Sequence, residues 1–289
     1  MTDAEEAGRL ILVGTPIGNL DDLSPRAVET LRTADVIAAE DTRRTRALLS
    51  HAGIPAGRRL RAVHGANETG AAIRIVSEVR SGRRVAVVTD AGMPGISDPG
   101  ATLVRACVDA DLRVEAVPGP SSALTALVVS GLPTDRFAFE GFLPRKGRAR
   151  AERLAAVAGD TRTTVVFEAP TRVHDTLADL ADVCGADRAV AVARELTKAF
   201  EEVWRGTLAD AVGHAERKQP RGEHVIVVGP AAEPAPAGHA DVEDAIRAAL
   251  ADGRSARDAA AEVAAELGVP RRRAYSVATR LRGARPPAG

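Results

Sequence analysis

The sequence RVAVVTDAGMPGISDPG, residues 84–100, joins an apolar run to an aspartate and a glycine-rich loop. The apolar run predicts a buried strand over residues 84–89, and the segment after the loop, 101–109, predicts a helix. Glycines permit positive φ angles and a close approach of the backbone to a ligand. Asp90 ends the strand, at the position where open α/β sheets bind their ligands. This stretch therefore predicts a ligand loop on an α/β sheet, although a tight structural turn is the alternative.

The same order of strand, loop and helix recurs in the first 118 residues. Apolar runs predict buried strands at residues 9–13, 36–39 and 113–117. Strands that are apolar throughout and alternate with helices are typical of a mainly parallel sheet covered on both faces. The loops after the strands of such a sheet would converge on one cleft.

The pattern changes after Ser121, where strands outnumber helices. A helix is expected at 122–130, followed by strands at 137–139, 163–167, 189–194, 201–207 and 224–228. We therefore predict two domains, a parallel-sheet α/β domain at 1–118 and a mixed α+β domain at 119–230. A Pro/Ala linker at 231–240 and a helical tail at 241–289 complete the expected organisation.

Composition indicates an ordinary globular protein, with 45% apolar and 27% charged residues. No apolar run approaches the roughly 20 residues of a membrane span. Residues 1–6 are acidic, whereas a signal peptide begins with basic residues. Cys107 and Cys184 form neither a disulfide framework nor a zinc motif. We expect a cytoplasmic protein with no membrane partner and no metal.

The net charge is zero, yet the basic residues are clustered. Arginine binds phosphate through two parallel hydrogen bonds, so the clusters are candidates for RNA binding. A solvated surface is the alternative for each cluster alone. The candidate RNA-binding residues are Arg43, Arg44, Arg145, Lys146, Arg148, Arg271, Arg272 and Arg273.

Seven stretches together resemble the bacterial ribosomal small-subunit methyltransferase I family, within the tetrapyrrole methylase superfamily. They are VGTPIGNL at 13–20, AAEDTR at 38–43, TDAGMPGISDPG at 89–100, VPGPS at 117–121, FEGFLPRK at 139–146, VARELTK at 192–198 and RGEHV at 221–225. The stretches occur in the order of the family. The chain departs from the family mildly: Gly14 replaces a usual alanine, EAPTR at 168–172 replaces ESPHR, and HGANE at 64–68 replaces HEHNE.

This resemblance implies a two-domain α/β fold, S-adenosylmethionine as the cofactor, and a homodimer. It also implies 2′-O-methylation of a decoding-centre cytidine in 16S rRNA, with the small ribosomal subunit as partner. By the same resemblance, the cofactor would contact the glycine-rich loop, the turn after residue 117 and two strand ends. The residues so assigned are Asp90, Gly92, Met93, Pro94, Gly95, Ile96, Ser97, Asp98, Pro118, Gly119, Pro120, Ser121, Ala123, Phe167 and Leu196.

Methyl transfer to a hydroxyl requires a group that accepts its proton. The candidates, in falling order of preference, are His64, Glu68 and Asp41. Two other functions stay open. A methylase of tetrapyrroles usually opens with a Gly-x-Gly-Pro-Gly-Asp loop, which residues 14–19 do not match. A nucleic-acid-binding protein without catalysis could use residues 270–282 as the recognition helix of a helix-turn-helix.

Overall fold

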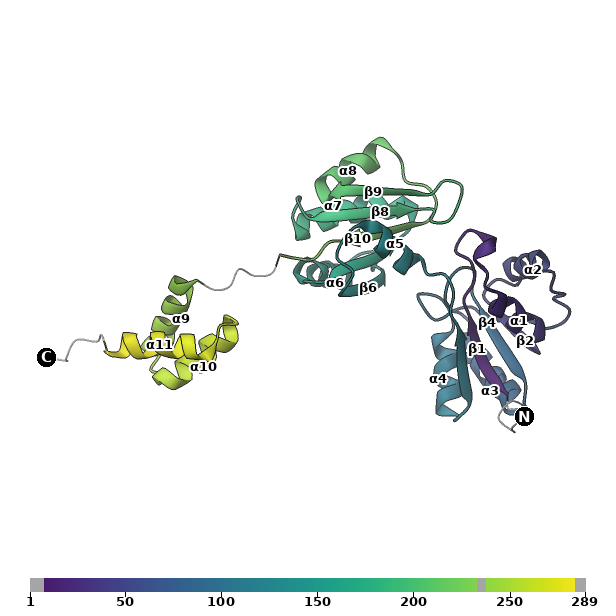
Figure 1. Ribbon diagram of the computed structural model, residues 1–289, viewed down its shortest axis with the longest axis horizontal. Coiled ribbons are helices and arrows are strands. Elements are labelled where there is room, and N and C mark those ends of the chain that lie inside the picture. The colour runs from purple at the N-terminus through teal and green to yellow at the C-terminus, as the bar shows by residue number, and fades with distance from the viewer. Residues whose placement is uncertain (1–7, 233–237, 284–289) are drawn as a thin grey trace. The chain divides into compact units, whose positions relative to one another are not determined.

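The computed structural model describes residues 8–232 and 238–283 (Figure 1). The chain divides into two compact units, Met1–Ala231 and Ala232–Gly289. The acidic residues 1–6 and most of the predicted linker, 233–237, lie outside the described residues. The two predicted domains of residues 1–230 therefore fall within one compact unit, and each has a sheet of its own.

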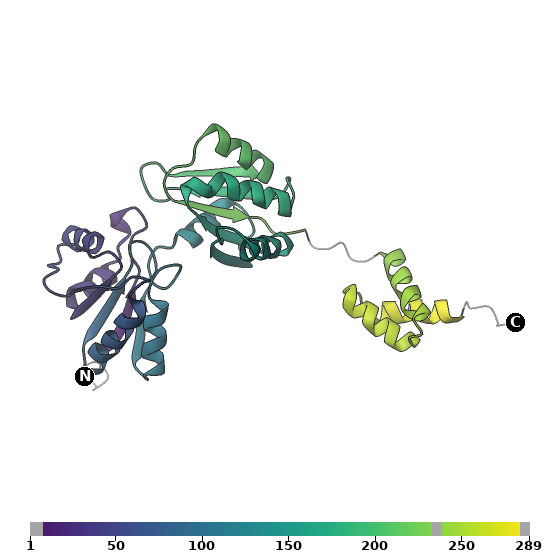
Figure 2. The same cartoon turned by 180° about the vertical axis from the view of Figure 1, so that it is seen from behind.

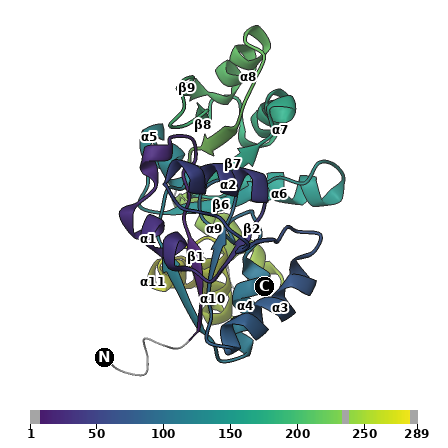
Figure 3. The same ribbon diagram turned by 90° about the vertical axis from the view of Figure 1, so that its right-hand side faces the viewer.

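The first sheet consists of five parallel strands in the order β3-β2-β4-β1-β5. Helices α1 and α2 cover one face through Leu31 and Leu49, whereas α3 and α4 cover the other through Ile75 and Leu103 (Figure 3). The parallel sheet confirms the predicted fold class. The element bounds are β1 Arg9–Val13, α1 Pro25–Thr33, β2 Val36–Ala39, α2 Thr42–His51, β3 Leu60–Ala62, α3 Glu68–Arg80, β4 Arg84–Val88, α4 Ala101–Asp109 and β5 Arg113–Val117.

The second sheet is mixed, in the order β6-β7-β10-β8-β9. Only β6 and β7 run parallel, whereas β10 is antiparallel to both of its neighbours and β9 to β8. Helices α6, α7 and α8 pack on one face and α5 packs on the other. The bounds are α5 Ser122–Ser130, β6 Phe137–Phe142, α6 Arg148–Gly159, β7 Thr163–Glu168, α7 Val173–Cys184, β8 Ala189–Arg194, β9 Glu202–Thr207, α8 Leu208–Arg217 and β10 His224–Val228.

The C-terminal unit contains three helices, α9 (His239–Ala251), α10 (Ala256–Glu266) and α11 (Arg271–Gly283), drawn in yellow and green in Figure 2. The helices share an apolar core that is rich in alanine and includes the larger side chains of Ile246 and Val263. The Ser255 hydroxyl accepts a hydrogen bond from the Asp258 amide at 3.1 Å, which caps the start of α10. Among the described helices, none is both long and apolar enough to cross a bilayer.

Candidate functional site

Three loops at the carboxyl ends of β1, β4 and β5 are joined by their backbones. The amide of Thr15 donates to the carbonyl of Gly92 at 2.9 Å, and the Gly92 amide donates back at 3.1 Å. The Gly14 amide donates to the Val117 carbonyl at 3.0 Å. A Cβ atom on Gly119 would lie 2.7 Å from the Gly14 Cα, so only glycine permits this approach. The predicted convergence of the loops is therefore present.

Next to these loops lies a cavity of about 310 Å³. This volume is at the lower end of the roughly 300–1,000 Å³ typical of small-molecule sites. One wall is apolar and is formed by Phe142, Phe167 and Val225. The rings of Phe142 and Phe167 meet edge to face with their centroids 5.7 Å apart. Aromatic surface of this kind suits a planar, uncharged ring of a ligand.

The charged side chains that line the cavity are mainly acidic. The Asp90 carboxylate accepts from the Asp41 amide at 3.1 Å and lies 3.3 Å from the Arg44 guanidinium. The Asp90 amide in turn donates to the Glu40 carboxylate at 3.3 Å. The carboxylates that line the cavity are those of Glu40, Asp90, Asp98, Glu168 and Glu223, against one arginine, Arg44. Such a balance favours a cationic ligand and disfavours phosphate.

Asp98 is the least compensated of these carboxylates. It forms no hydrogen bond and no ion pair with any residue in the described part of the chain. Burial raises the pKa of Asp98 to about 6, and the charges of Glu40, Asp90 and Glu223 add to the increase. The preceding residue, Ser97, has a φ of 64°. This left-handed conformation is uncommon for residues other than glycine. The loop thus holds Asp98 in the cavity wall through a strained residue.

Glu168, by contrast, is fully compensated. Its buried carboxylate accepts from the Thr176 hydroxyl at 2.7 Å and from the Ala169 amide at 2.8 Å. It also forms an ion pair with Arg172 at 2.5 Å. The EAPTR turn of this chain therefore keeps the two charged residues of the family's ESPHR turn in contact, and the substituted positions are not part of this pair.

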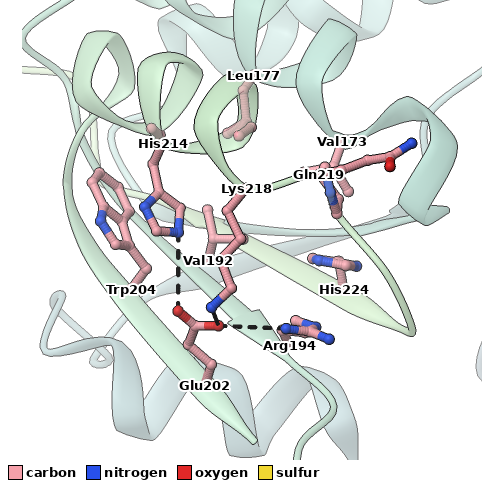
Figure 4. Close-up of a pocket in the computed structure, with 13 residues that line it drawn as sticks. Val173, Leu177, Val192, Arg194, Glu202, Trp204, His214, Lys218, Gln219 and His224 are labelled. Carbon is pink, nitrogen blue, oxygen red and sulfur yellow. Dashed lines mark hydrogen bonds and ion pairs between the residues drawn. The ribbon is translucent and has the colours of Figure 1, made fainter. Parts of the chain in front are cut away.

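His224 lies opposite Glu168 in the register of β10 and β7. Its ring is buried, its Nδ1 lies 3.1 Å from the Gly222 carbonyl oxygen, and burial lowers its pKa. His224 also borders a second hollow, on the helical face of the sheet (Figure 4). There Trp204 stacks on His214 with centroids 5.3 Å apart.

This second hollow is not a cofactor site. Its volume is about 40 Å³, which is space for only a few water molecules. Its polar side chains also bind one another, because Glu202 contacts His214 at 3.9 Å, Arg194 at 3.6 Å and the Lys218 ammonium (Figure 4).

The structure places part of the predicted cofactor set in the larger cavity, and with it one predicted RNA-binding arginine. The predicted residues that line it are Asp90, Ser97, Asp98, Phe167 and Arg44. The others lie in the joined loops, in α5 (Ala123) or in the loop after β8 (Leu196), and their role in cofactor binding stays a prediction. Those residues are Gly92, Met93, Pro94, Gly95, Ile96, Pro118, Gly119, Pro120, Ser121, Ala123 and Leu196.

None of the three predicted proton acceptors lines the cavity. Glu68 accepts hydrogen bonds from the amides of Gly100 and Thr102, at 2.7 and 3.2 Å, and so caps α4. Asp41 caps α2 and binds Arg43. His64 is exposed. Their catalytic role stays a prediction without support from the geometry.

Sequence reasoning did not assign several residues of the cavity. They include Glu40, Ser122, Phe142, Glu168, Glu223 and His224. Five of these lie at strand ends or next to them, as Asp90 does, and Phe142 is one of them because it ends β6. Glu40 follows β2, Glu168 ends β7, and Glu223 and His224 stand at the start of β10.

The chain is similar to known proteins over most of its length. The tetrapyrrole (corrin/porphyrin) methylases match residues 9–212. Two relatives named ribosomal RNA small subunit methyltransferase I are 44% identical (Synechocystis sp., 95% of this chain and 98% of the relative) and 48% identical (Xylella fastidiosa, 93% and 98%).

Solved structures share the fold at lower identity. A cobalt precorrin-4 methyltransferase covers 81% of this chain and 99% of its own with a TM-score of 0.58 and 20% identity. The Thermus thermophilus uroporphyrin-III C-methyltransferase complexed with S-adenosylhomocysteine covers 77% and 97%, with a TM-score of 0.55 and 22% identity. The fold, the loops and the sequence relatives agree: the chain belongs to the ribosomal RNA small subunit methyltransferase I family of the tetrapyrrole methylases.

Proposed function

We propose that this protein transfers a methyl group from S-adenosylmethionine to the ribose 2′-hydroxyl of a decoding-centre cytidine in 16S rRNA. The observation that carries the proposal is the agreement with relatives named for small-subunit rRNA methylation, at 44–48% identity over more than nine tenths of both chains. The position of the methyl group and the identity of the nucleotide rest on the family resemblance of the sequence motifs.

The cavity has the properties that this cofactor requires. S-adenosylmethionine carries a planar adenine, a sulfonium and an ammonium group. Phe142 and Phe167 offer apolar surface for a ring, and the excess of carboxylates offers a negative field for the cations. The bound cofactor supplies an electrophilic methyl group, and the chain's residues orient both reactants and exclude water.

Basic residues near the cavity are suited to hold the RNA backbone outside it. Arg44 lines the cavity. Arg145 and Lys146 follow Phe142 by three and four residues, are exposed, and form no ion pair within the described chain. Arg43 and Arg148 are exposed but bind Asp41 and Glu152. We assign all five to RNA binding, and Arg271, Arg272 and Arg273 of α11 with them, because arginine and lysine contact phosphates.

The experiment is methylation of 16S rRNA and of isolated small subunits by the purified protein, followed by mass spectrometry of the nucleosides. The methyl group is expected on the sugar fragment of a single cytidine. Calorimetry with chelator present is expected to detect S-adenosylmethionine binding without metal. A methylated base would overturn the 2′-O assignment, and no cofactor binding at millimolar concentration would overturn the enzyme assignment in favour of an RNA-binding protein. Methylation of a tetrapyrrole but not of RNA would establish the other alternative.

The family resemblance also implies a homodimer in the cytoplasm. Light scattering should then give twice the 30.1 kDa mass of one chain. A mass of one chain at all protein concentrations would overturn the dimer.

A further inference from the structure

We propose that a separate hollow beside the cofactor cavity binds the base of the target nucleotide, and that the Thr45 hydroxyl forms a hydrogen bond with this base. The inference deepens the proposed function and rests on it. This space, the α2 hollow, has a volume of about 240 Å³, and its walls are the loop after β1, helix α2 and the end of β4.

The α2 hollow adjoins the cofactor cavity. Arg44 and Asp90 line both spaces, and their ion pair at 3.3 Å lies where the two meet. The reacting oxygen of the substrate must lie in line with the methyl group of the cofactor, so the target nucleotide needs space directly beside it. The small hollow of Figure 4 also adjoins the cavity, through His224, but has room for only a few water molecules. A ribose at the Arg44–Asp90 pair can direct its hydroxyl toward the cofactor and its base into the α2 hollow.

The two spaces differ in charge. The charged side chains in the wall of the α2 hollow are one arginine and one aspartate, Arg44 and Asp90, which neutralise each other. The cofactor cavity has five carboxylates against the same arginine. A cationic ligand is therefore favoured in the cavity and an uncharged one in the α2 hollow. A nucleobase is uncharged at neutral pH, whereas a phosphate group and a sulfonium are not.

Apolar side chains offer a surface for the face of a base. Pro16, Leu20 and Leu48 line the α2 hollow, and Leu20 is 42% exposed although it is a large apolar residue. Enzymes that act on a nucleotide within folded nucleic acid take it out of the stack. They hold its base against apolar side chains and form hydrogen bonds with its polar edge. The α2 hollow therefore requires a polar group for the edge of the base.

Thr45 supplies this polar group. Three buried threonines line the hollow, and two of them are already engaged. The Thr15 hydroxyl donates to the Thr89 carbonyl at 3.2 Å, and the Thr89 hydroxyl donates to the Ala91 carbonyl at 3.5 Å. Thr45 is 3% exposed, and its hydroxyl forms no hydrogen bond with any residue that the structure describes. A buried hydroxyl without a partner is unfavourable. Since a hydroxyl both donates and accepts, it can pair with either kind of group on the edge of a base.

The first test removes this hydroxyl and measures single-turnover methylation of small subunits at saturating cofactor. Thr45→Val keeps the size of the side chain, and the rate is expected to fall about fivefold or more, because a polar group of the base loses its partner. Thr45→Ser retains the hydroxyl and should recover most of this loss. The melting temperature of Thr45→Val should not fall, because the hydroxyl has no partner in the described part of the protein.

The second test fills the α2 hollow. Ala47 is exposed and lines it, so Ala47→Leu occupies part of the space without entering the core. A displacement of a substrate by about 1 Å can cost roughly 100-fold in rate, and a loss of this order is expected. The matched control is Ser50→Leu, at another exposed position of α2 that does not line the hollow, and it should keep the wild-type rate. Calorimetry should give the wild-type affinity for S-adenosylmethionine in all the variants.

Each other result is decisive as well. If Ala47→Leu keeps the wild-type rate, the base does not lie in the α2 hollow. If Thr45→Val keeps that rate, or Thr45→Ser loses as much as Thr45→Val, the Thr45 hydroxyl does not contact the base. If the variants bind cofactor weakly but react at the wild-type rate when saturated, the hollow belongs to the cofactor site. If the wild-type protein methylates no RNA, the proposed function itself fails, and this outcome is separate from the others.

Discussion

At the scale of single residues, the contrast between Glu168 and Asp98 explains how one cavity holds two kinds of carboxylate. Glu168 is fixed, because Arg172 and the Thr176 hydroxyl both bind it. Asp98 has no donor in the described chain. The protein itself therefore holds one carboxylate in place, whereas it leaves the other without a donor.

The structural role of Glu168 can be tested at Thr176, which is fully buried. The Thr176 hydroxyl donates to Glu168 and accepts from Arg150 at 3.0 Å. Thr176→Val keeps the volume but leaves both groups without this partner, so the free energy of unfolding should fall by about 1–3 kcal/mol. Urea unfolding followed by the fluorescence of Trp204, the single tryptophan, measures the change. Thr176→Ser retains the hydroxyl and is the control; a larger loss in this variant would contradict the role of the hydrogen bond.

For Asp98 we expect the opposite effect: its substitution should raise the free energy of unfolding. The pKa of Asp98 is about 6 in the folded protein and near its usual 3.8 when unfolded, so the folded state binds this proton more tightly. Ionised Asp98 therefore destabilises the fold above pH 6, and the cost disappears as the pH falls toward 4. Asp98→Asn should raise the free energy of unfolding at pH 8 by about 1–2 kcal/mol, with allowance for partial exposure.

The pH dependence distinguishes this charge effect from a general change in packing. The difference between Asp98→Asn and wild type should shrink from pH 8 to pH 4, measured as the melting temperature. An equal gain at both pH values would show that the carboxylate charge is not its source. A gain in stability together with a loss of activity is the exchange expected of a functional residue whose charge the fold does not compensate.

At the scale of elements, the start of α4 is capped by the side chain of a residue from another helix. Gly100 stands at the N-cap with a φ of 140° and has no side chain to bind the free amides. Glu68, the first residue of α3, binds the amides of Gly100 and Thr102 instead. A carboxylate at a helix N-terminus is also favoured by the helix dipole.

Glu68 can therefore be tested as a cap and as a proton acceptor in one experiment. Glu68→Gln keeps an acceptor oxygen and should lower the free energy of unfolding only slightly, whereas Glu68→Ala should lower it by about 0.5–2 kcal/mol, as for other lost caps. The methylation rate per folded molecule should stay within a few fold in both variants. A rate loss of 100-fold or more in Glu68→Gln, at unchanged stability, would support Glu68 as the proton acceptor.

The elements also show what sequence can and cannot predict. β1 and β2 have the predicted bounds because each is a short, mainly apolar run between clear loop signals. β5 also has the predicted bounds, but only its Val117 is buried, because the strand lies at the edge of the sheet. β3 was missed because its three residues, Leu-Arg-Ala, are at the sheet edge and mostly exposed.

In the cavity, Asp90 and Asp98 were predicted from the loop after a strand, but His224 faces Glu168 only through long-range antiparallel pairing. Phe142 lies beyond the predicted strand end, because β6 continues through an irregularity at Phe139 and Gly141.

At the scale of the whole molecule, the C-terminal unit is compact by itself and presents basic residues that are not neutralised locally. Arg271 and Arg272 are exposed and form no ion pair in the described chain. Arg280, on the same helix, is bound to Glu243 at 2.7 Å. Arg271 and Arg272 are thus free to contact phosphate, whereas Arg280 would first have to separate from Glu243.

The C-terminal unit should therefore contribute to RNA affinity and not to chemistry. A chain ending at Ala231 should bind RNA more weakly and with a flatter salt dependence, because each phosphate contact adds roughly 0.7–0.9 to the log–log slope. Its affinity for S-adenosylmethionine should stay within about a factor of two, because the cavity lies wholly within residues 40–225. Fluorescence anisotropy of labelled RNA at several salt concentrations measures both the affinity and the slope.

Two substitutions refine this prediction within the intact chain. Arg271→Gln with Arg272→Gln should lower the slope by about 1.4–1.8, twice the contribution of one contact. Arg247→Gln is the matched control, because Arg247 is equally a surface arginine of the unit but is paired with Glu243 and Asp244. It should leave the slope unchanged. If truncation lowers the melting temperature while the slope stays at its wild-type value, the three helices serve stability and the RNA is held by the basic residues of the N-terminal unit alone.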